Sequence, residues 1–250
     1  MIILKNNNEI RKMREAGRIV SEALLLMEKN IRPGISTWEL DRIAEEFITK
    51  QGAVPSFKGY GGFPGSICAS INDVVIHGFP LKEAILKEGD IISVDMGAVK
   101  DHYHGDAART FAVGEVTQEA KDLIRVTREA FFAGFAVCEI GRHLSDISHA
   151  VESYITPFGY GVVRDYVGHG IGRNLHEQPN VPNYGKPGHG PILREGMVLA
   201  IEPMVNVGSY EVVLLEDGWT VKTKDGSLSA HYENTVAFTE HGPQLLTLTT

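Results

Sequence analysis

Two strongly apolar stretches of the sequence each end in a carboxylate. Asp95 follows Ile91–Val94, and Glu202 follows Met197–Ile201. Burying an unpaired carboxylate costs several kcal/mol, so each acid needs a neutralising partner. An Arg or Lys would serve, but each stretch is instead followed by a further acid, Asp106 in the first case and Glu233 in the second.

Histidines precede both acid pairs, as His77-Gly78 and His169-Gly170. Four carboxylates brought together would carry about four negative charges, which two divalent cations would balance, and carboxylates can bridge two ions. A site made mostly of oxygen with one imidazole suits Mn, Fe, Co or Zn, among which the sequence does not choose. Such a centre indicates metal-assisted hydrolysis.

The segment 168–177 is the most distinctive in the chain, with three glycines around His169 and with His176 close behind. A phosphate-binding glycine loop would need a helix directly after it. Gln178-Pro179-Asn180 is a poor helix start. The segment is better suited to presenting His169 and His176 to a cleft on a tight backbone. We interpret the remaining histidines as background, although His104 and His231 lie two positions from proposed ligands and could support them.

Four helices are expected to position these groups. Apolar residues at three- and four-residue steps from Ile10 to Met27 predict the first helix. A capping box at Ser36–Glu39 opens the second, which Gly52 ends. A third begins near Gln118 and a fourth near Ser145. The clearest strands are Ile91–Met96 and Met197–Glu202.

The two halves of the chain align at a fixed interval of 107 residues, which places Asp95 on Glu202 and Gly34 on Gly141. This indicates an internal duplication of a helix-helix-sheet unit. We expect one α+β domain over residues 1–250 with pseudo-two-fold symmetry. Its halves span about 8–110 and 117–240 and share one sheet, with helices covering one face.

Composition excludes several classes of function. The chain has 250 residues and a net charge of −8, which argues against broad nucleic-acid binding. No apolar run is long enough to cross a membrane. The polar N-terminus is unlike a signal peptide, and two cysteines fit a reducing cytoplasm, so a cytoplasmic protein is expected.

Taken together, these motifs resemble the methionine aminopeptidases along nearly the whole chain. The stretches that carry the resemblance are Ser70–Gly78, Val94–Gly97, Gly105-Asp106, Gly168–Gly172, Ile201–Pro203 and Tyr232–Thr235. The form is similar to type I, because no N-terminal extension is present and only 32 residues separate His169 from Glu202. The resemblance implies the pita-bread (creatinase/aminopeptidase) fold, with a curved antiparallel sheet. It also implies removal of the initiator methionine from nascent polypeptides, with a preference for a small second residue.

The resemblance also implies roles for individual residues. Asp95 would bind one metal through both oxygens, Asp106 and Glu233 would bridge two metals, and His169 and Glu202 would complete the second. His77 and His176 would contact substrate, and Glu202 would also act as the base. The methionine pocket would be formed by Tyr60, Phe63, Cys68, Leu175 and Trp219. A monovalent-cation site would match Asn72, Val74 and Ser229. Phe57 and Leu175 depart from the usual Cys and Phe, which puts only fine substrate preference in doubt.

Other functions are compatible with part of this pattern. A related enzyme of the same fold cleaves before proline, but such enzymes usually carry a large N-terminal domain. A catalytically inactive binding protein would tend to lose ligands, and all five are present here. In a non-metallic ligand-binding domain the acids would be solvated or salt-bridged. We expect a monomer whose partners are nascent chains beginning with Met; the ribosome is a further candidate partner on which the sequence says little.

Overall fold

The computed structural model describes residues 1–248 of the chain. All four expected helices are present. Two short 3₁₀ helices, η1 and η2, are present as well. Their bounds are α1 Asn7–Asn30, α2 Thr37–Lys50, η1 Tyr60–Gly62, α3 Gln118–Ala136, α4 Leu144–Ile155 and η2 Thr156–Phe158.

Side-chain caps fix where the helices begin. The predicted capping box of α2 is confirmed, since Ser36 Oγ accepts from Glu39 N and the Glu39 carboxylate accepts from Ser36 N. Asn6 and Glu9 form the same arrangement at the start of α1. Each box satisfies two backbone N–H groups that have no partner within the helix.

Fifteen strands lie within the described residues, and every pairing between them is antiparallel. Their bounds are β1 Val54–Pro55, β2 Ile67–Ile71, β3 Val74–Ile76, β4 Ile91–Lys100, β5 Tyr103–Ala112, β6 Gly161–Val162, β7 Gly168–Gly170, β8 Glu177–Val181, β9 Val198–Ile201, β10 Met204–Asn206, β11 Val212–Leu214, β12 Val221–Thr223, β13 Ser229–His231, β14 Asn234–Thr239 and β15 Gly242–Leu245.

The strands do not form the single continuous ladder expected from the sequence. They fall into four hydrogen-bonded sets, of which the largest are β1-β4-β2 with β5 beside β4, and β15-β14-β9-β7-β8. Where β5 meets β14, the side chain of Thr235 bonds the backbone of Asp106, and the two strands are not paired as a regular ladder. Asp106 N donates to Thr235 Oγ1 at 3.0 Å, and this hydroxyl donates to Asp106 O at 2.9 Å. The two largest sets therefore meet at the proposed ligand Asp106.

The same contacts recur at an interval of 107 residues. An isolated bridge joins Ser36 to Ile85, and another joins His143 to Ile192. Gly34 N donates to Leu86 O, and likewise Gly141 N donates to Leu193 O. The start of α2 is thus bonded to the segment before β4, and the start of α4 is bonded in the same way to the segment before β9.

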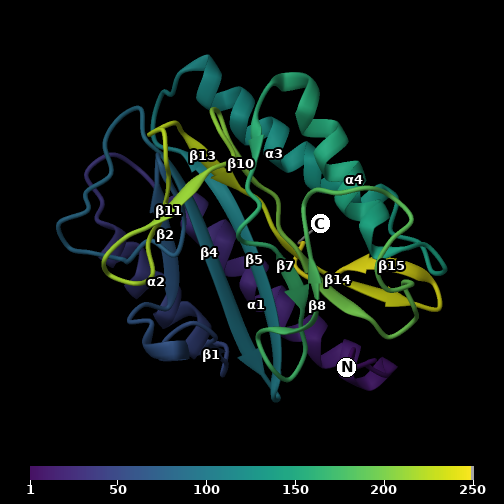
Figure 1. Cartoon of the computed structure of the whole chain (residues 1–250). Coiled ribbons are helices and arrows are strands. Elements are labelled where there is room, and N and C mark those ends of the chain that lie inside the picture. The colour runs from purple at the N-terminus through teal and green to yellow at the C-terminus, as the bar shows by residue number, and fades with distance from the viewer. Residues whose placement is uncertain (249–250) are drawn as a thin grey trace.

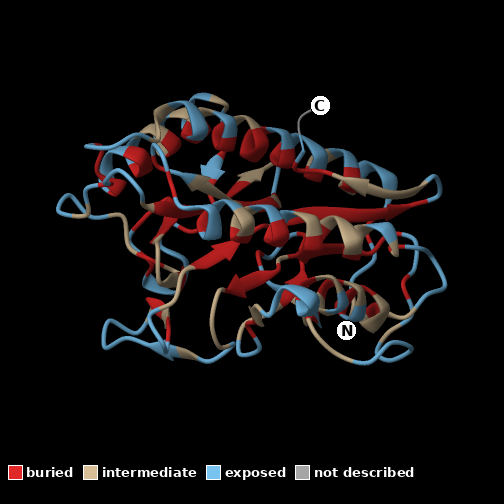
Figure 2. Cartoon of the chain, turned by 90° about the horizontal axis from the view of Figure 1, so that it is seen from above, coloured by how far each residue is buried: buried red, intermediate tan, exposed pale blue. Residues whose placement is uncertain are grey.

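Helices cover strands that are almost fully buried. In Figure 1, α1 runs behind β4 and β5, and it contacts both strands. Helices α3 and α4 pack on each other, and α3 also contacts β13. Figure 2 shows most of the strands buried, although strands such as β11 and β15 are partly exposed, and it shows the outer faces of the helices exposed. Within residues 1–248, no helix is long and apolar enough to span a membrane.

Candidate active site

The five proposed metal ligands come from distant segments and surround one cavity of about 130 Å³. Asp95 lies on β4, Asp106 on β5 and His169 on β7, whereas Glu202 follows β9 and Glu233 lies between β13 and β14. The cavity is lined by Phe57, Tyr60, Phe63, Cys68, His77, Asp95, Asp106, His169, Leu175, His176, Glu202, Trp219 and Glu233. Every metal and substrate residue proposed from the sequence is therefore in this lining.

Strand register brings the two aspartates together. Asp95 faces Ala108 and Asp106 faces Gly97 in the β4–β5 pairing. The two aspartates are thus diagonal neighbours on one face of the sheet, within reach of each other's side chains. Cys68 faces Asp95 from the other neighbouring strand, β2, and so joins the same face.

The four carboxylates have no Arg or Lys partner among the described residues. The nearest guanidinium, that of Arg109, donates instead to the backbone oxygens of Ala108 and Glu233 and to Asn234 Oδ1. One oxygen each of Asp95, Asp106 and Glu233 is buried without a hydrogen-bond partner in the described part of the chain. The salt-bridge alternative for these acids is therefore wrong.

Burial and mutual repulsion act on these acids together. Burial raises the pKa of Asp95 to about 7. Burial also raises the pKa values of Asp106, Glu202 and Glu233 well above their ordinary values, and the neighbouring carboxylates raise them further. The four acids are thus costly to ionise as they stand, and a cation among them would remove that cost.

Donor atoms of Asp106, His169 and Glu233 all lie within 4.8 Å of one another. His169 Nε2 is 3.8 Å from Asp106 Oδ2 and 3.6 Å from Glu202 Oε1. Carboxylate oxygens with one imidazole form a donor set that divalent first-row metals accept. The unpartnered oxygens and the donor spacing therefore both fit a metal centre.

A backbone contact suits the proposed role of His169 as a metal ligand. Its Nδ1 is 2.8 Å from Gly170 O, so an Nδ1–H donated to this carbonyl leaves the Nε2 lone pair free for a metal. The flanking glycines let three strands approach closely. A Cβ on Gly168 would lie 2.3 Å from Ala200 O, and one on Gly170 would lie 2.2 Å from Gln178 O.

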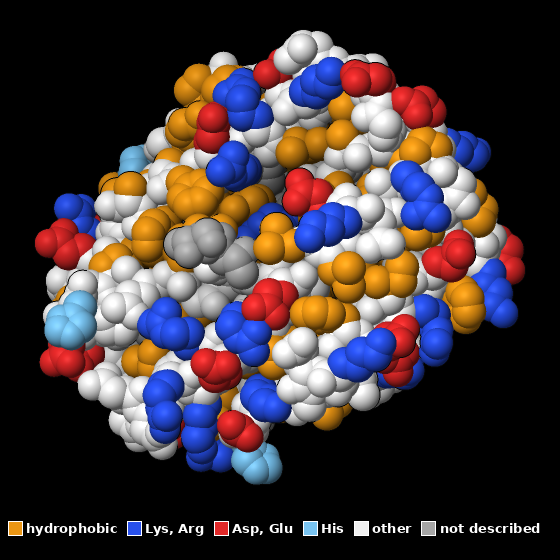
Figure 3. All heavy atoms as spheres, turned by 180° about the vertical axis from the view of Figure 1, so that it is seen from behind, with side chains coloured by type: hydrophobic (Ala, Val, Ile, Leu, Met, Phe, Trp, Pro, Cys, Tyr) orange, Lys and Arg blue, Asp and Glu red, His pale blue; other side chains and the backbone are white. Residues whose placement is uncertain are grey.

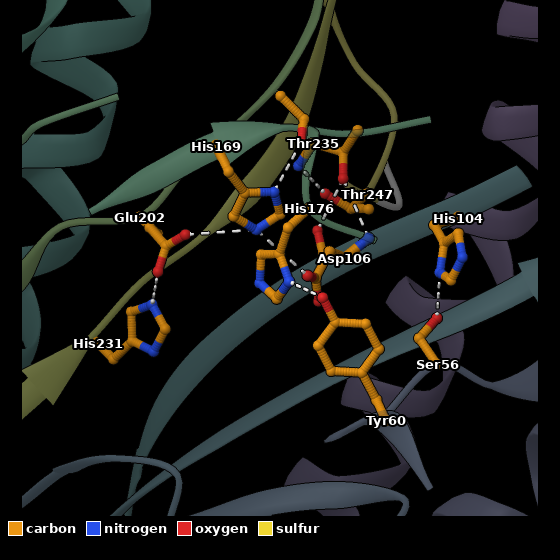
Figure 4. A network of polar contacts seen from close by, with 11 residues as sticks. Ser56, Tyr60, His104, Asp106, His169, His176, Glu202, His231, Thr235 and Thr247 are labelled. Atoms are coloured by element: carbon orange, nitrogen blue, oxygen red, sulfur yellow. Dashed lines mark hydrogen bonds and ion pairs between the residues drawn. The ribbon is translucent and has the colours of Figure 1, made fainter. Parts of the chain in front are cut away.

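His176 stands beside His169, with ring centroids 4.3 Å apart. Its Nδ1 is 2.8 Å from the hydroxyl of Tyr60, a residue that we assigned from the sequence only to the methionine pocket. Figure 4 shows Tyr60 pointing its hydroxyl at His176. If this hydroxyl donates, Nε2 of His176 carries the proton and is the atom that can donate to substrate.

His77 also lines the cavity and is held by aromatic rings. It has a positive φ of 59° directly after β3. Its ring meets those of Tyr166 and Trp219 edge-on, with centroids 5.9 and 6.0 Å apart. Burial lowers the pKa of His77 to about 4, so the imidazole is neutral at pH 7.

An apolar slot adjoins the carboxylates. Phe63 packs against Trp219 with centroids 5.2 Å apart, and Cys68 and Leu175 are almost fully buried in the same cluster. Phe57 is part of the lining, although from the sequence it was only a departure from the usual pattern. Burial raises the pKa of the Cys68 thiol, so Cys68 presents an uncharged group to the slot.

The two histidines treated as background differ in their surroundings. His231 is buried, with Nε2 3.7 Å from Glu202 Oε2, so Glu202 lies between His169 and His231 (Figure 4). In the sequence, only the position of His231 two residues before Glu233 indicated that it could lie near the ligands. His104 contacts Ser56 Oγ at 2.9 Å, and its backbone N donates to Gly172 O. It therefore supports the histidine segment and contacts no proposed ligand.

The proposed monovalent-cation residues lie outside this cavity but near one another. Ser229 N donates to Asn72 O at 2.9 Å, and Val74 lies on β3 close by in sequence. The Asn72 side chain is already bonded to Asp90 and to Ile91 N. The cation site stays a prediction.

Comparison with known proteins identifies relatives along the whole chain. Methionine aminopeptidase of Clostridium acetobutylicum is 62% identical over 248 residues, which cover 99% of both chains. The crystal structure of methionine aminopeptidase from Thermotoga maritima superposes with a TM-score of 0.98 at 48% identity and covers both chains completely.

The chain also resembles, more distantly, the structure of an enzyme of the proline-specific class that the sequence left as an alternative. The Xaa-Pro dipeptidase from Bacillus anthracis superposes with a TM-score of 0.80 at 26% identity, and the match covers 99% of this chain but 62% of that one. The sequence model of metallopeptidase family M24 matches residues 11–240. Because this model matches almost the whole chain, and because the acid cluster lines the cavity, the chain belongs to metallopeptidase family M24.

Proposed function

We propose that this protein is a methionine aminopeptidase that removes the initiator methionine from nascent polypeptides and peptides, with a preference for a small second residue. One observation carries the proposal: a cluster of unpaired buried acids opens directly onto a small apolar slot in one cavity. Identity of 62% with a relative of that name supports the same activity.

Two divalent ions, of Co, Mn, Fe or Zn, would be held by Asp95, Asp106, His169, Glu202 and Glu233. Bound there, they would supply a water that loses its proton near neutral pH and would polarise the peptide carbonyl. Four carboxylates match the charge of two such ions, and the unpartnered oxygens of Asp95, Asp106 and Glu233 would gain partners.

The side chains of the chain itself would manage protons around the scissile bond. Glu202 would take a proton from the attacking water and return it. His176, with Tyr60 on its Nδ1, would donate from Nε2 to the carbonyl oxygen as negative charge develops there. His77, neutral at pH 7, would position the nitrogen of the leaving peptide.

The slot explains the choice of residue to be removed. A flexible thioether fits an aromatic-lined cavity and makes sulfur–aromatic contacts, here with Phe63 and Trp219. A free α-amino group would bind at the mouth of the slot, where the metal centre would offer it an open coordination position. An internal methionine lacks that group, so the enzyme would act only at N-termini.

Two alternatives differ from this proposal in measurable ways. A proline-specific peptidase is disfavoured by 26% identity to the Xaa-Pro dipeptidase against 62% to the methionine aminopeptidase. An inactive binding protein is disfavoured because all five proposed ligands line the cavity. Neither alternative has an observation in its favour that the first proposal lacks.

The test is release of methionine from Met-Gly-Met-Met by the full chain loaded with Mn or Co. We expect turnover that a chelator abolishes and that added metal restores. Release only of residues that precede proline would favour the proline-specific alternative. No turnover with any of the four metals would favour an inactive binding protein.

The His176→Ala variant separates the role of His176 from that of a ligand. We expect turnover to fall by about two to three orders of magnitude, as when one oxyanion donor is lost, while metal content by atomic emission stays normal. Loss of metal from this variant would mean that His176 is a ligand.

Further aspects of this function are proposed on narrower grounds. The halves 8–110 and 117–240 would form one catalytic domain, since ligands from both line a single cavity. The enzyme would act as a monomer in the cytoplasm, where nascent chains emerge from the ribosome. A monovalent cation at Asn72, Val74 and Ser229 would brace the strands next to the cavity.

A further inference from the structure

Lys5 and Glu177 form an ion pair in the interior of the protein. Lys5 Nζ lies 2.6 Å from Glu177 Oε2, and each side chain is 3% exposed. In the other Lys or Arg ion pairs of the described residues, each side chain is at least 26% exposed. Figure 3 shows charged side chains of this exposed kind spread over the back face of the molecule. Apolar residues often stabilise a buried place as well as an ion pair does, so this pair indicates a role beyond stability.

Glu177 follows His176 directly, and its carboxylate closes the turn that leads to this histidine. Glu177 Oε1 accepts from Asn174 N at 3.2 Å, while Oε2 accepts from Lys5 Nζ. Within the same turn, Gly172 N donates to Asn174 O at 3.1 Å. The carboxylate therefore holds the backbone before His176, and Lys5 holds the carboxylate.

Lys5 is itself fixed by the backbone around it. Its N donates to Gly196 O at 2.7 Å, and its Nζ also donates to Ile3 O at 2.9 Å. Gly196 has a positive φ of 84°, and a Cβ there would lie 2.7 Å from Lys5 O. Because Gly196 lies just before β9 and Glu177 begins β8, Lys5 joins the two segments that flank the strand of His169.

Gly172 brings the ion pair into direct contact with the histidine segment, residues 171–177. A Cβ on Gly172 would lie 2.5 Å from Lys5 Cε and 2.6 Å from Glu177 Oε1. The Gly172 carbonyl accepts from His104 N at 2.9 Å on β5. Since protein interiors are close-packed, a shift of the ion pair would displace this segment.

The other contacts of His176 are made by its ring. Its Nδ1 lies 2.8 Å from the Tyr60 hydroxyl, and its ring lies against that of His169 with centroids 4.3 Å apart. Neither contact fixes the backbone that carries the ring. The turn closed by Glu177 does so.

We propose that Lys5 and Glu177 are positioning residues for His176. They hold its backbone so that Nε2 points at the carbonyl oxygen of the scissile bond. This inference rests on the proposed function, in which His176 donates to that oxygen. Groups that support a catalytic side chain typically change turnover by about ten- to a hundredfold, and we expect the lower end because Tyr60 remains in place.

Two double variants separate positioning from stability. Lys5→Met with Glu177→Gln removes both charges and keeps an oxygen that can accept from Asn174 N, whereas Lys5→Met with Glu177→Leu keeps no acceptor. With Met-Gly-Met-Met as substrate, the Leu variant should lose about tenfold in kcat with little change in KM. The Gln variant should stay within about threefold of the wild-type kcat. Equal kcat values in the two folded variants would overturn the proposal.

The matched control removes an exposed pair of the same residue types. Lys50→Met with Glu46→Leu on α2 should leave kcat unchanged. A second control combines the Lys5→Met and Glu177→Leu substitutions with His176→Ala. If the ion pair acts through His176, the combined variant should be no slower than His176→Ala alone. A further tenfold loss would show that the pair acts on the fold as a whole and would refute the positioning role.

Hydrogen exchange followed by mass spectrometry provides a measurement that needs no substrate. In the metal-loaded full chain, exchange within the histidine segment should be about fivefold faster in the Leu variant and unchanged in the Gln variant. Unchanged exchange in the Leu variant would overturn the inference. Absence of methionine release by the wild-type chain would instead refute the proposed function, and the exchange measurement would still decide whether the ion pair holds the segment.

Discussion

Replacing Asp95 by Asn should make the metal-free protein more stable at alkaline pH, although it removes a proposed ligand. Asp95 is buried among three other acids, and one of its oxygens lacks a partner within residues 1–248. Without a cation, its ionised form is opposed by burial and by its neighbours. Asn has nearly the same shape and no charge, so the variant removes the opposition and leaves the packing intact.

The magnitude follows from the pKa of Asp95, which burial raises from 3.8 to about 7. This difference corresponds to about 4 kcal/mol against the ionised form in the folded state. Between these two pH values the folded state holds a proton that the unfolded state has lost, so wild-type stability falls as pH rises. The advantage of Asp95→Asn should therefore be near zero below about pH 4 and about 4 kcal/mol at pH 8.

Urea unfolding with a chelator present, at several pH values between 4 and 8, measures this difference. Asp225→Asn is a control for which we expect the opposite change in the free energy of unfolding, namely a loss of stability. Hydrogen bonds from Ser209 N, Ser227 N and the Ser227 side chain lower the pKa of Asp225 to about 2, so this carboxylate contributes stability above about pH 4. If Asp95→Asn were less stable than wild type at pH 8 without metal, the repulsion argument would be refuted.

Three further variants test how the site is held. Tyr60→Phe removes the hydroxyl from His176 Nδ1 and should lower kcat about tenfold with little change in KM; an unchanged kcat would show that Tyr60 does not position His176. Lys5→Met breaks the buried Lys5–Glu177 ion pair and should cost about 3 kcal/mol in urea unfolding, most of which Glu177→Leu in the same chain should restore. Gly170→Ala places a Cβ 2.2 Å from Gln178 O, so it should lower Tm and metal affinity together; a normal metal affinity would mean that the strands can separate without moving His169.

Local sequence patterns predict the helices and the acidic ligand candidates well, because these patterns depend only on residues that are close in the sequence. The α2 capping box needs only Ser36 and a Glu three residues later. The acids Asp95 and Glu202 stand out because a carboxylate rarely follows such an apolar run. Glu202 does follow the end of β9, whereas β4 continues past Asp95 to Lys100, so the end of that strand was predicted too early. Their convergence follows from the 107-residue interval, which places them at equivalent positions.

Contacts between distant segments could not be predicted in this way. Tyr60 and His176 are 116 residues apart, and no periodicity relates a 3₁₀ turn to a histidine segment. The Lys5–Glu177 ion pair likewise depends on how elements pack that are far apart in the sequence. Between β5 and β14, Thr235 bonds Asp106 through its side chain instead of through a regular strand ladder, and strand propensity does not encode such a contact.

The duplication also explains why the cavity is asymmetric. Cys68 and Leu175 are 107 residues apart and both line the slot, as Asp95 and Glu202 both line the acid cluster. The positions equivalent to His169 and His176, however, are Gly62 and Ala69, so imidazoles on this register enter from the second half only. In the proposed complex, the carbonyl oxygen of the scissile peptide bond would need a hydrogen-bond donor, which His176 of the second half would supply. Because the first half has Gly62 where the second half has the proposed ligand His169, the two halves contribute different groups to the one cavity.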